Sequence, residues 1–352
     1  MRSLLPLCLL LAACSDVNDL KRLTTSDEFE QAPDNSVDIL WVIDNSVSMQ
    51  NEQEAVAAGT SDFVENLEKG DMDFHLGVIT TDVDDVNANA GVLLGNPQVL
   101  TSTCREDGDP SDCTYVDAFT SRVLQGTDGS DQERGLEAAL TALSPPLSDT
   151  RNSGFLRDDA ALVIIILSDE NDCSDFGALG PDGSGEDCYT QNADLMPVQD
   201  IVSRFKDLKK DSSKVSLSGI IGPRVVDDTY CEQTYPGTRY YSAIDLLRGV
   251  AADICQTDYS TVMDQLGLVA SGILTTFQLS KAAVVESIVV TVTPAGGAPK
   301  EVKQDATNGW TYLEDYARIQ FNGDAVPERG AQIEVEYEVA GPVPDPPEET
   351  TP

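Results

Sequence analysis

Three oxygen-bearing side chains stand two positions apart directly after an apolar run. The run is Ile39–Ile43, and Asp44, Ser46 and Ser48 follow it. A short run rich in Val, Ile and Trp favours a strand buried on both faces, whereas Asp, Asn and Ser favour a turn. One carboxylate and two hydroxyls on a tight turn can face one point, and such hard donors suit Mg²⁺, Mn²⁺ or Ca²⁺. We therefore predict a divalent-cation site; the alternative is a turn that caps the following helix.

Two later segments also place polar side chains next to predicted regular structure. Ser130 stands in a polar stretch that opens a helix reaching about Leu143. Asp169 follows the most apolar run of the chain, which ends at Leu167. The carboxyl ends of parallel strands meet at one edge of a sheet, and open α/β sheets bind ligands there. We expect Asp44 and Asp169 to lie at that shared edge.

Together, the Asp-x-Ser-x-Ser motif and the two later segments resemble the von Willebrand factor A (vWA) domain and its metal-ion-dependent adhesion site (MIDAS). The resemblance covers about residues 36–279. It implies that Ser46 and Ser48 bind the metal directly and that Ser130 binds it directly or through water. Asp44 and Asp169 would hold metal-bound waters, and an Asp or Glu of a partner protein would complete the shell.

The chain departs from the family pattern at two places. The family has Thr where this chain has Ser130, followed five positions later by a small residue, which here is Gly135. Thr127 is a rival for this ligand, and Ser130 could instead cap the next helix. Most members read Thr-Asp-Gly around the last aspartate, whereas this chain has Glu170 after Asp169. The local sequence is similar to that of cysteine-containing vWA lipoproteins of gliding and predatory bacteria.

A second cation site is a further hypothesis. Its candidate residues are acids that follow two predicted strands, Asp82, Asp84, Asp85, Glu170, Asp172 and Asp175. Alternating acids and amides resemble calcium-binding loops, but the glycine expected at the turn of such a loop is missing. The alternative for the first three acids is a solvated loop.

The order of predicted elements indicates an α/β fold. Strands and helices alternate over residues 36–279, which predicts a doubly wound, mostly parallel sheet flanked by helices, as in vWA and Rossmann-like folds. The period changes near residue 281, and Ile333, Val335 and Tyr337 alternate with glutamates. We predict a small, sandwich-like all-β module over residues 281–340. Residues 14–35 read as a polar tether and residues 341–352 as a disordered Pro-rich, acidic tail.

The first residues resemble a lipoprotein signal peptide. A charged start precedes a short apolar stretch over residues 4–13, which is too short to span a bilayer as a helix. Cys14 follows Leu-Ala-Ala, as in the bacterial lipobox, which implies cleavage of residues 1–13 and lipidation of Cys14. We expect a bacterial cell-envelope protein anchored by lipid, with the outer membrane favoured; an ordinary secreted protein is the alternative.

The remaining six of the eight cysteines suggest disulfide bonds, because an even number in an exported chain is typical of them. Six cysteines allow fifteen full pairings, so the sequence cannot fix their connectivity. Local spacing favours three pairs, Cys104–Cys113, Cys173–Cys188 and Cys231–Cys255.

The net charge of −39 opposes nucleic acid and anionic lipid surfaces as partners and permits cation binding. With His75 as the only histidine, Ser-His-Asp and Cys-His catalysis lack support, and His75 reads as a packed strand residue. We therefore expect a metal-dependent binding or adhesion protein rather than an enzyme. The alternatives are a structural envelope component and, with less support, a metal-dependent hydrolase.

Overall fold

The computed structural model describes residues 23–31, 35–70, 72–83, 90–102, 115–179, 185–190, 192–225, 234–272, 275–314 and 317–340. The predicted signal peptide, Cys14 and the 341–352 tail lie outside these ranges. The chain divides into two compact units. The larger unit contains residues 30–275 and 327–331, and the smaller unit contains the rest.

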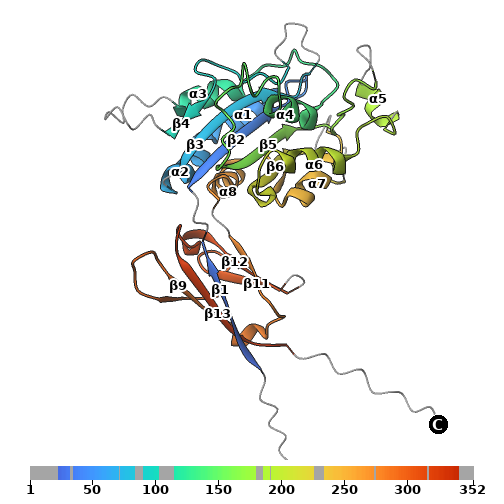
Figure 1. The fold of residues 1–352 in the computed structure, drawn as a ribbon. Coiled ribbons are helices and arrows are strands. Elements are labelled where there is room, and N and C mark those ends of the chain that lie inside the picture. Colours follow the sequence, from blue (N-terminus) through green and yellow to red (C-terminus); the bar gives the residue numbers. More distant parts are fainter. Residues whose placement is uncertain are drawn as a thin grey trace, which may run out of the picture. The chain divides into compact units, whose positions relative to one another are not determined.

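A six-stranded sheet forms the centre of the larger unit, in the order β4-β3-β2-β5-β6-β7 (Figure 1). All neighbouring strands are parallel except β4, which pairs antiparallel with β3. The strands are β2 (Ser36–Ile43), β3 (Asp73–Thr80), β4 (Leu100–Thr101), β5 (Ala161–Ser168), β6 (Val215–Ile221) and β7 (Ala251–Asp253). The predicted α/β class with a mostly parallel sheet is confirmed.

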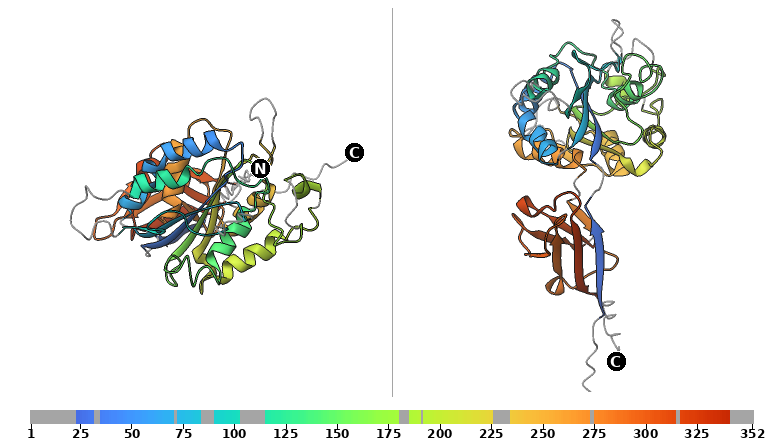
Figure 2. Two further views of the ribbon diagram at one scale, coloured as in Figure 1. Left: turned by 90° about the horizontal axis from the view of Figure 1, so that it is seen from above. Right: turned by 60° about the vertical axis from the view of Figure 1, so that its left-hand side comes forward.

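Helices cover both faces of this sheet (Figure 2). One face carries α1 (Gln50–Ala58), α2 (Thr60–Lys69), α3 (Tyr115–Val123) and α8 (Ser260–Ala270). The other carries α4 (Gly135–Leu143), α6 (Val198–Asp207) and α7 (Thr238–Leu247). The described part of this unit also contains a short helix, α5 (Gly185–Thr190), and a 3-10 turn, Ser212–Lys214. None of the helices in the described ranges is long and apolar enough to cross a membrane.

Strand β2 shows why the sheet lies between two helical layers. Its side chains alternate between the faces, so that Ile39 and Trp41 pack on one side and Leu40 and Val42 on the other. All four are fully buried. A strand covered on both faces reads as a continuous apolar run, which is the pattern that predicted it.

The smaller unit is an all-β structure of two antiparallel-paired sheets, in the orders β1-β13-β9-β10 and β11-β12-β8. Its strands are β1 (Thr24–Glu30), β8 (Thr276–Gln278), β9 (Val289–Thr293), β10 (Lys300–Val302), β11 (Trp310–Leu313), β12 (Arg318–Phe321) and β13 (Gln332–Glu338). Two 3-10 turns, Val285–Ser287 and Gly323–Ala325, lie between them. In β13, Ile333, Val335 and Tyr337 are buried, as predicted.

The boundaries of the smaller unit correct the prediction. Residues 24–30, which the sequence assigned to a tether, form β1 and lie next to β13 in the sheet. The ring of Phe29 contacts that of Phe277, with centroids 5.3 Å apart. The prediction failed because Thr-Thr-Ser-Asp-Glu-Phe-Glu has too little apolar character to indicate a strand without its distant partner.

One predicted disulfide is confirmed, between Cys173 and Cys188. Cys255 is also disulfide-bonded. Its predicted partner, Cys231, lies outside the described residues. Both cysteines of the predicted Cys104–Cys113 pair also lie outside them.

Candidate metal centre

The strand ladder brings two predicted site residues to one edge of the larger unit. Asp44 follows β2 and Asp169 follows β5, its parallel neighbour. The backbone N–H of Asp44 donates to Leu167 O at 2.9 Å, and that of Thr81, after β3, donates to Ile43 O at 3.1 Å. The pairing of the strands thus continues into the turns and fixes their relative positions at the carboxyl edge of the sheet, as predicted.

The Asp-x-Ser-x-Ser turn is held by its own side chains. Asp44 Oδ1 accepts a hydrogen bond from Ser46 N at 2.8 Å, and Asp44 Oδ2 accepts one from Ser168 Oγ at 2.7 Å. The hydroxyl oxygens of Ser46 and Ser48 lie 3.3 Å apart. The two hydroxyls are therefore neighbours on the turn that begins with the fully buried Asp44; their role as metal ligands stays a prediction.

The loop that carries Ser130 is tied to this turn by Gln53 of α1. Gln53 Nε2 donates to Asp44 O at 2.8 Å and to Gly126 O at 2.9 Å. Its Oε1 accepts from the N–H groups of Gln125 and Gly126 at 2.9 and 3.1 Å. All four hydrogen-bonding positions of the buried amide are used. Sequence reasoning missed Gln53, because a glutamine within a helix carries no sign of burial.

A second backbone contact fixes the same loop. Gly129 N donates to Asn45 O at 2.9 Å. A Cβ atom on Gly129 would lie 2.5 Å from Asn45 Cγ, so the close approach requires glycine. Ser130 is half-buried and its Oγ accepts from Gln132 N at 3.1 Å. The rival Thr127 lies in the same loop and is also half-buried.

The alternative role for Ser130, capping of the next helix, is wrong. Helix α4 begins at Gly135, and its first amides are satisfied by other elements. Gly135 N donates to Tyr240 Oη at 3.2 Å, and Leu136 N donates to Asp172 Oδ1 at 3.0 Å. A Cβ on Gly135 would lie 2.5 Å from Tyr240 Oη, which explains why a small residue stands there.

Asp169 is buried and lacks a partner for one oxygen. Only 3% of the residue is exposed, and its Oδ1 accepts no hydrogen bond. Burial and the nearby charge of Asp44 raise the pKa of Asp169 to about 8. Burial and Asp44 also raise the pKa of Glu170 to about 7. Ionised together, these carboxylates repel one another in a poorly solvated place.

Glu133 is a third buried carboxylate at this edge. It is 1% exposed, Thr81 Oγ1 donates to its Oε2, no donor reaches its Oε1, and its carboxyl lies within hydrogen-bonding reach of that of Asp44. Burial and Asp44 raise its pKa well above the ordinary value. Sequence reasoning missed it because an acid three positions after Ser130 reads as part of a capping box.

The donor set fits a hard divalent cation. The buried oxygens without a partner at this edge belong to Asn45, Glu52, Glu133 and Asp169. Carboxylate, hydroxyl and amide oxygens are the ligands that Mg²⁺, Mn²⁺ and Ca²⁺ prefer. The described residues contain no group of three or more His, Cys, Asp or Glu side chains that could hold a metal by themselves. A direct ligand set at this edge would therefore combine carboxylates with other oxygen donors, such as hydroxyl or amide oxygens.

Of the acids proposed for a second cation site, Asp172 and Asp175 are already paired with the protein's own cations. Asp172 Oδ2 is paired with Arg239 Nε at 3.1 Å, and Asp175 Oδ1 with Arg134 Nε at 3.0 Å. These two aspartates bind arginine side chains and backbone amides of the protein itself. They are therefore not available as ligands of a calcium-binding loop. Asp82 is half-buried beyond β3, and Asp84 and Asp85 lie outside the described residues. Glu170 adjoins the first site instead.

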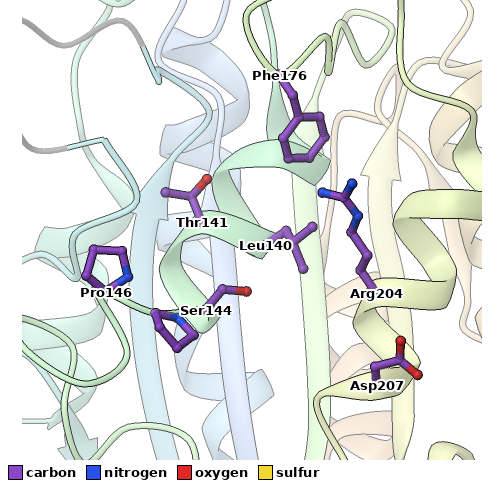
Figure 3. A pocket seen from close by; sticks show the side chains of 8 residues that line it. Leu140, Thr141, Ser144, Pro146, Phe176, Arg204 and Asp207 are labelled. Atoms are coloured by element: carbon purple, nitrogen blue, oxygen red, sulfur yellow. The ribbon is translucent and has the colours of Figure 1, made fainter.

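Two pockets of the larger unit are lined by other residues than those of the Asp44 turn. One has a volume of 340 Å³ and lies between α4 and α6, where the Arg204 guanidinium stands over the Phe176 ring at 5.2 Å (Figure 3). The other has a volume of 430 Å³ and is lined by Asn171, Cys188, Tyr189, Asn192, Leu195, Thr238 and Arg239. Asn171, which lines the second pocket, lies two positions after Asp169 in the sequence.

Comparisons with known proteins give remote matches only. No protein-family model and no curated protein matches the sequence. Among solved structures, the chain is similar to a von Willebrand factor type A protein from Catenulispora acidiphila, with 12% identity and a TM-score of 0.39 over 91% of this chain. The pilus adhesin SpaC from Lactobacillus rhamnosus GG matches with 15% identity and a TM-score of 0.41 over 92%. The pilus adhesin RrgA from Streptococcus pneumoniae matches with 11% identity and a TM-score of 0.36 over 92%.

The chain spans 66%, 42% and 60% of the lengths of these three structures, less than two thirds in each case. At such identities the role of the carboxyl edge has to be judged from this chain's own residues.

Proposed function

We propose that this chain is a surface adhesion or protein-binding protein that acts through a divalent cation at the carboxyl edge of its larger unit. Mg²⁺ is the first candidate, with Mn²⁺ and Ca²⁺ as alternatives. Ser46 and Ser48 would bind the cation directly, Ser130 directly or through water, and Asp44 and Asp169 through water. A carboxylate of a partner protein would fill the remaining position. Membrane attachment through Cys14 stays a prediction.

The observation that carries this proposal is the burial of Asp44, Glu133 and Asp169 side by side. The charged groups that act most strongly on Glu133 and Asp169 are other acids. Buried charges are costly unless an opposite charge compensates them. A bound cation supplies that compensation, and the unpartnered oxygens of Glu133 and Asp169 are available to it or to its waters.

The position of the only histidine favours binding over catalysis. His75 lies near the start of β3, and its Nδ1 is 2.9 Å from Phe155 O. Five residues separate it from Thr80 at the carboxyl end of the strand, about 16 Å at the usual rise of a strand. His75 is thus too far from the candidate metal centre to serve there as a base.

Calorimetric titration of the purified chain with MgCl₂, MnCl₂ and CaCl₂ tests the proposal. We expect one cation per chain in the native protein, loss of binding in Asp44→Ala, and affinity lowered about tenfold or more in Glu133→Gln, since one compensating charge is removed. Asp149→Asn is the control, because Asp149 is an exposed acid in the segment that follows α4, away from the Ser130 loop. Equal binding by the native protein and Asp44→Ala, or no binding by either, would contradict a metal centre at this turn.

A further inference from the structure

Exposed apolar side chains gather around the candidate metal centre. The described residues include eight large hydrophobic side chains that are exposed. Of these, Val47, Leu124, Val225 and Tyr235 stand on loops, and Tyr189 stands on α5. Val47, between the two serines, is 81% exposed. Clustered exposed apolar side chains rimmed by polar groups are typical of protein-binding surfaces.

Two of the five form a pair beside Asp169. The rings of Tyr189 and Tyr235 have centroids 5.3 Å apart. Tyr235 N donates to Asp169 O at 2.8 Å, and Tyr189 Oη accepts from Asn171 N at 3.4 Å. The Cys173–Cys188 disulfide holds the helix of Tyr189 to the loop of Asp169. The tyrosine pair is therefore fixed to the metal-site loop at two points.

A pocket opens next to this pair. Its volume of 430 Å³ lies within the range of ligand pockets, and Tyr189, Leu195 and Arg239 are among its lining residues. Asn171, at its mouth, is held by Arg239 N at 2.9 Å and by Thr238 Oγ1 at 3.2 Å. A side chain that followed a metal-bound carboxylate along a partner segment would meet the tyrosine rings and this pocket.

The charge around the site indicates which other side chains a partner would need. Asp128 and Asp131 are exposed on the Ser130 loop, and Glu170 follows Asp169. Arg134 and Arg239 are each paired with a buried aspartate, and Arg224, the exposed cation next to Val225, is paired with Asp245. A cation at the centre would thus be one positive point within a negative rim, which attracts basic groups placed around a single carboxylate.

We propose that the partner segment carries one Asp or Glu flanked within a few residues by an aromatic side chain and by Lys or Arg, with the aromatic side chain resting on Tyr189 and Tyr235. This rests on the proposed function, and it adds the chemistry of the partner to it. Val47 and Leu124 complete the apolar contact on the other side of the metal centre.

A random peptide library displayed on phage tests this partner chemistry. Peptides are selected on the immobilised full chain in MgCl₂ and eluted with EDTA. We expect the eluted peptides to be enriched in Asp or Glu with an aromatic residue and a basic residue nearby. In Tyr189→Ser/Tyr235→Ser, the affinity of a selected peptide should fall about tenfold, as loss of aromatic contacts implies. Leu246→Ser is the matched control, because Leu246 is 40% exposed on α7.

The outcomes separate the two proposals. Acidic peptides without an aromatic and basic bias, or unchanged affinity in the double tyrosine variant, would overturn the partner chemistry and leave the metal centre standing. An absence of EDTA-eluted peptides from the native chain, or the same yield from Asp44→Ala, would overturn the metal-dependent function and this inference with it.

Discussion

At the residue scale, the unusual feature of this protein is a set of buried acidic side chains at the carboxyl edge of the sheet. Asp44, Asp169 and Glu133 are more than nine-tenths buried, and burial is the largest cause of the raised pKa of each. Hydrogen bonds from Ser46 and Ser168 stabilise the ionised form of Asp44 but do not outweigh its burial. The free protein is therefore under electrostatic strain at the place where we propose that it binds a cation.

This strain predicts how stability depends on pH. A carboxyl whose folded pKa is about 8, against 3.8 in the unfolded chain, binds its proton more tightly when folded. The stabilisation of the folded state by this tighter proton binding is fully present below pH 3.8 and is lost as the pH rises through 8. In EDTA we expect the Tm of the native chain to fall between pH 5 and pH 8. In MgCl₂ the fall should be smaller, because the cation stabilises the ionised form.

Thermal unfolding of Asp169→Asn provides the control. Since the amide does not titrate, this variant should show a weaker pH dependence in EDTA and little response to MgCl₂. An identical pH dependence in the native chain and the variant would show that Asp169 does not carry the effect.

The sequence indicated some of these residues and hid others, for physical reasons. Asp44, Ser46 and Ser48 were readable because an apolar strand ends directly before them. Glu133 was hidden, since burial of an acid depends on neighbours from β2 and β3 that are distant in sequence. Asp172 misled for the same reason: its partner Arg239 stands 67 residues away on α7.

At the scale of elements, the start of α4 shows how the site is assembled. The first amides of this helix are satisfied by Tyr240 of α7 and by Asp172 and Ser174 of the loop after β5. Cys173 N also donates to Glu133 O at 2.7 Å. Side chains that resembled calcium ligands therefore serve to join α4, α7 and the β5 loop, and this junction positions Glu133.

Helix α1 supplies the next prediction through Gln53. Replacing Gln53 by Met keeps the volume but removes four hydrogen bonds. We expect the free energy of unfolding to fall by about 2–4 kcal/mol, since buried backbone groups lose their partners. Affinity for the cation should fall too, because the loop of Ser130 is released. Urea unfolding and calorimetric titration measure the two effects.

Gln50→Met is the matched control on the same helix. Gln50 is exposed and bonds only across one turn to Glu54, so its replacement should change stability by less than about 0.5 kcal/mol. If the two variants unfolded alike, Gln53 would have no special part in holding the loop.

Prediction of the elements succeeded where one strand carries enough apolar surface by itself. Strands β2, β3, β5 and β6 are apolar because both of their faces are covered, and each was recognisable alone. Strand β1 was not, since its alternate side chains are exposed or only half-buried. This segment becomes a strand because it pairs with β13. A local sequence pattern does not reveal a partner so far away in the chain.

At the scale of the whole molecule, the smaller unit is made from both ends of the chain. Strand β1 comes from the first thirty residues, and the other six strands follow the larger unit. Ser26 Oγ donates to Glu334 Oε1 at 3.2 Å, and Tyr337 Oη donates to Asp27 Oδ2 at 2.7 Å. The main segment of the larger unit, residues 30–275, is thus inserted between the first strand of the smaller unit and its other strands.

This arrangement predicts the effect of truncation. Removing residues 1–30 takes away β1, leaves one edge of β13 unpaired and exposes the surface that Phe29 covers. We expect the smaller unit to lose about 2 kcal/mol or more, the contribution of one buried aromatic side chain. A chain that lacks only residues 1–22 keeps β1 and serves as the comparison. Scanning calorimetry compares the two chains, and equal transitions would contradict a structural role for β1.

The same insertion sets the order in which the chain can fold as it is made. Strand β1 is synthesised first, yet the residue that Ser26 contacts in β13 is 308 positions later. The strands of the larger unit's sheet lie closer together in sequence. This unit can therefore fold while β1 is still unpaired. Pairing of β1 therefore has to wait until synthesis has passed β13. In a chain whose synthesis stopped at residue 275, the first strand would have no partner in its sheet.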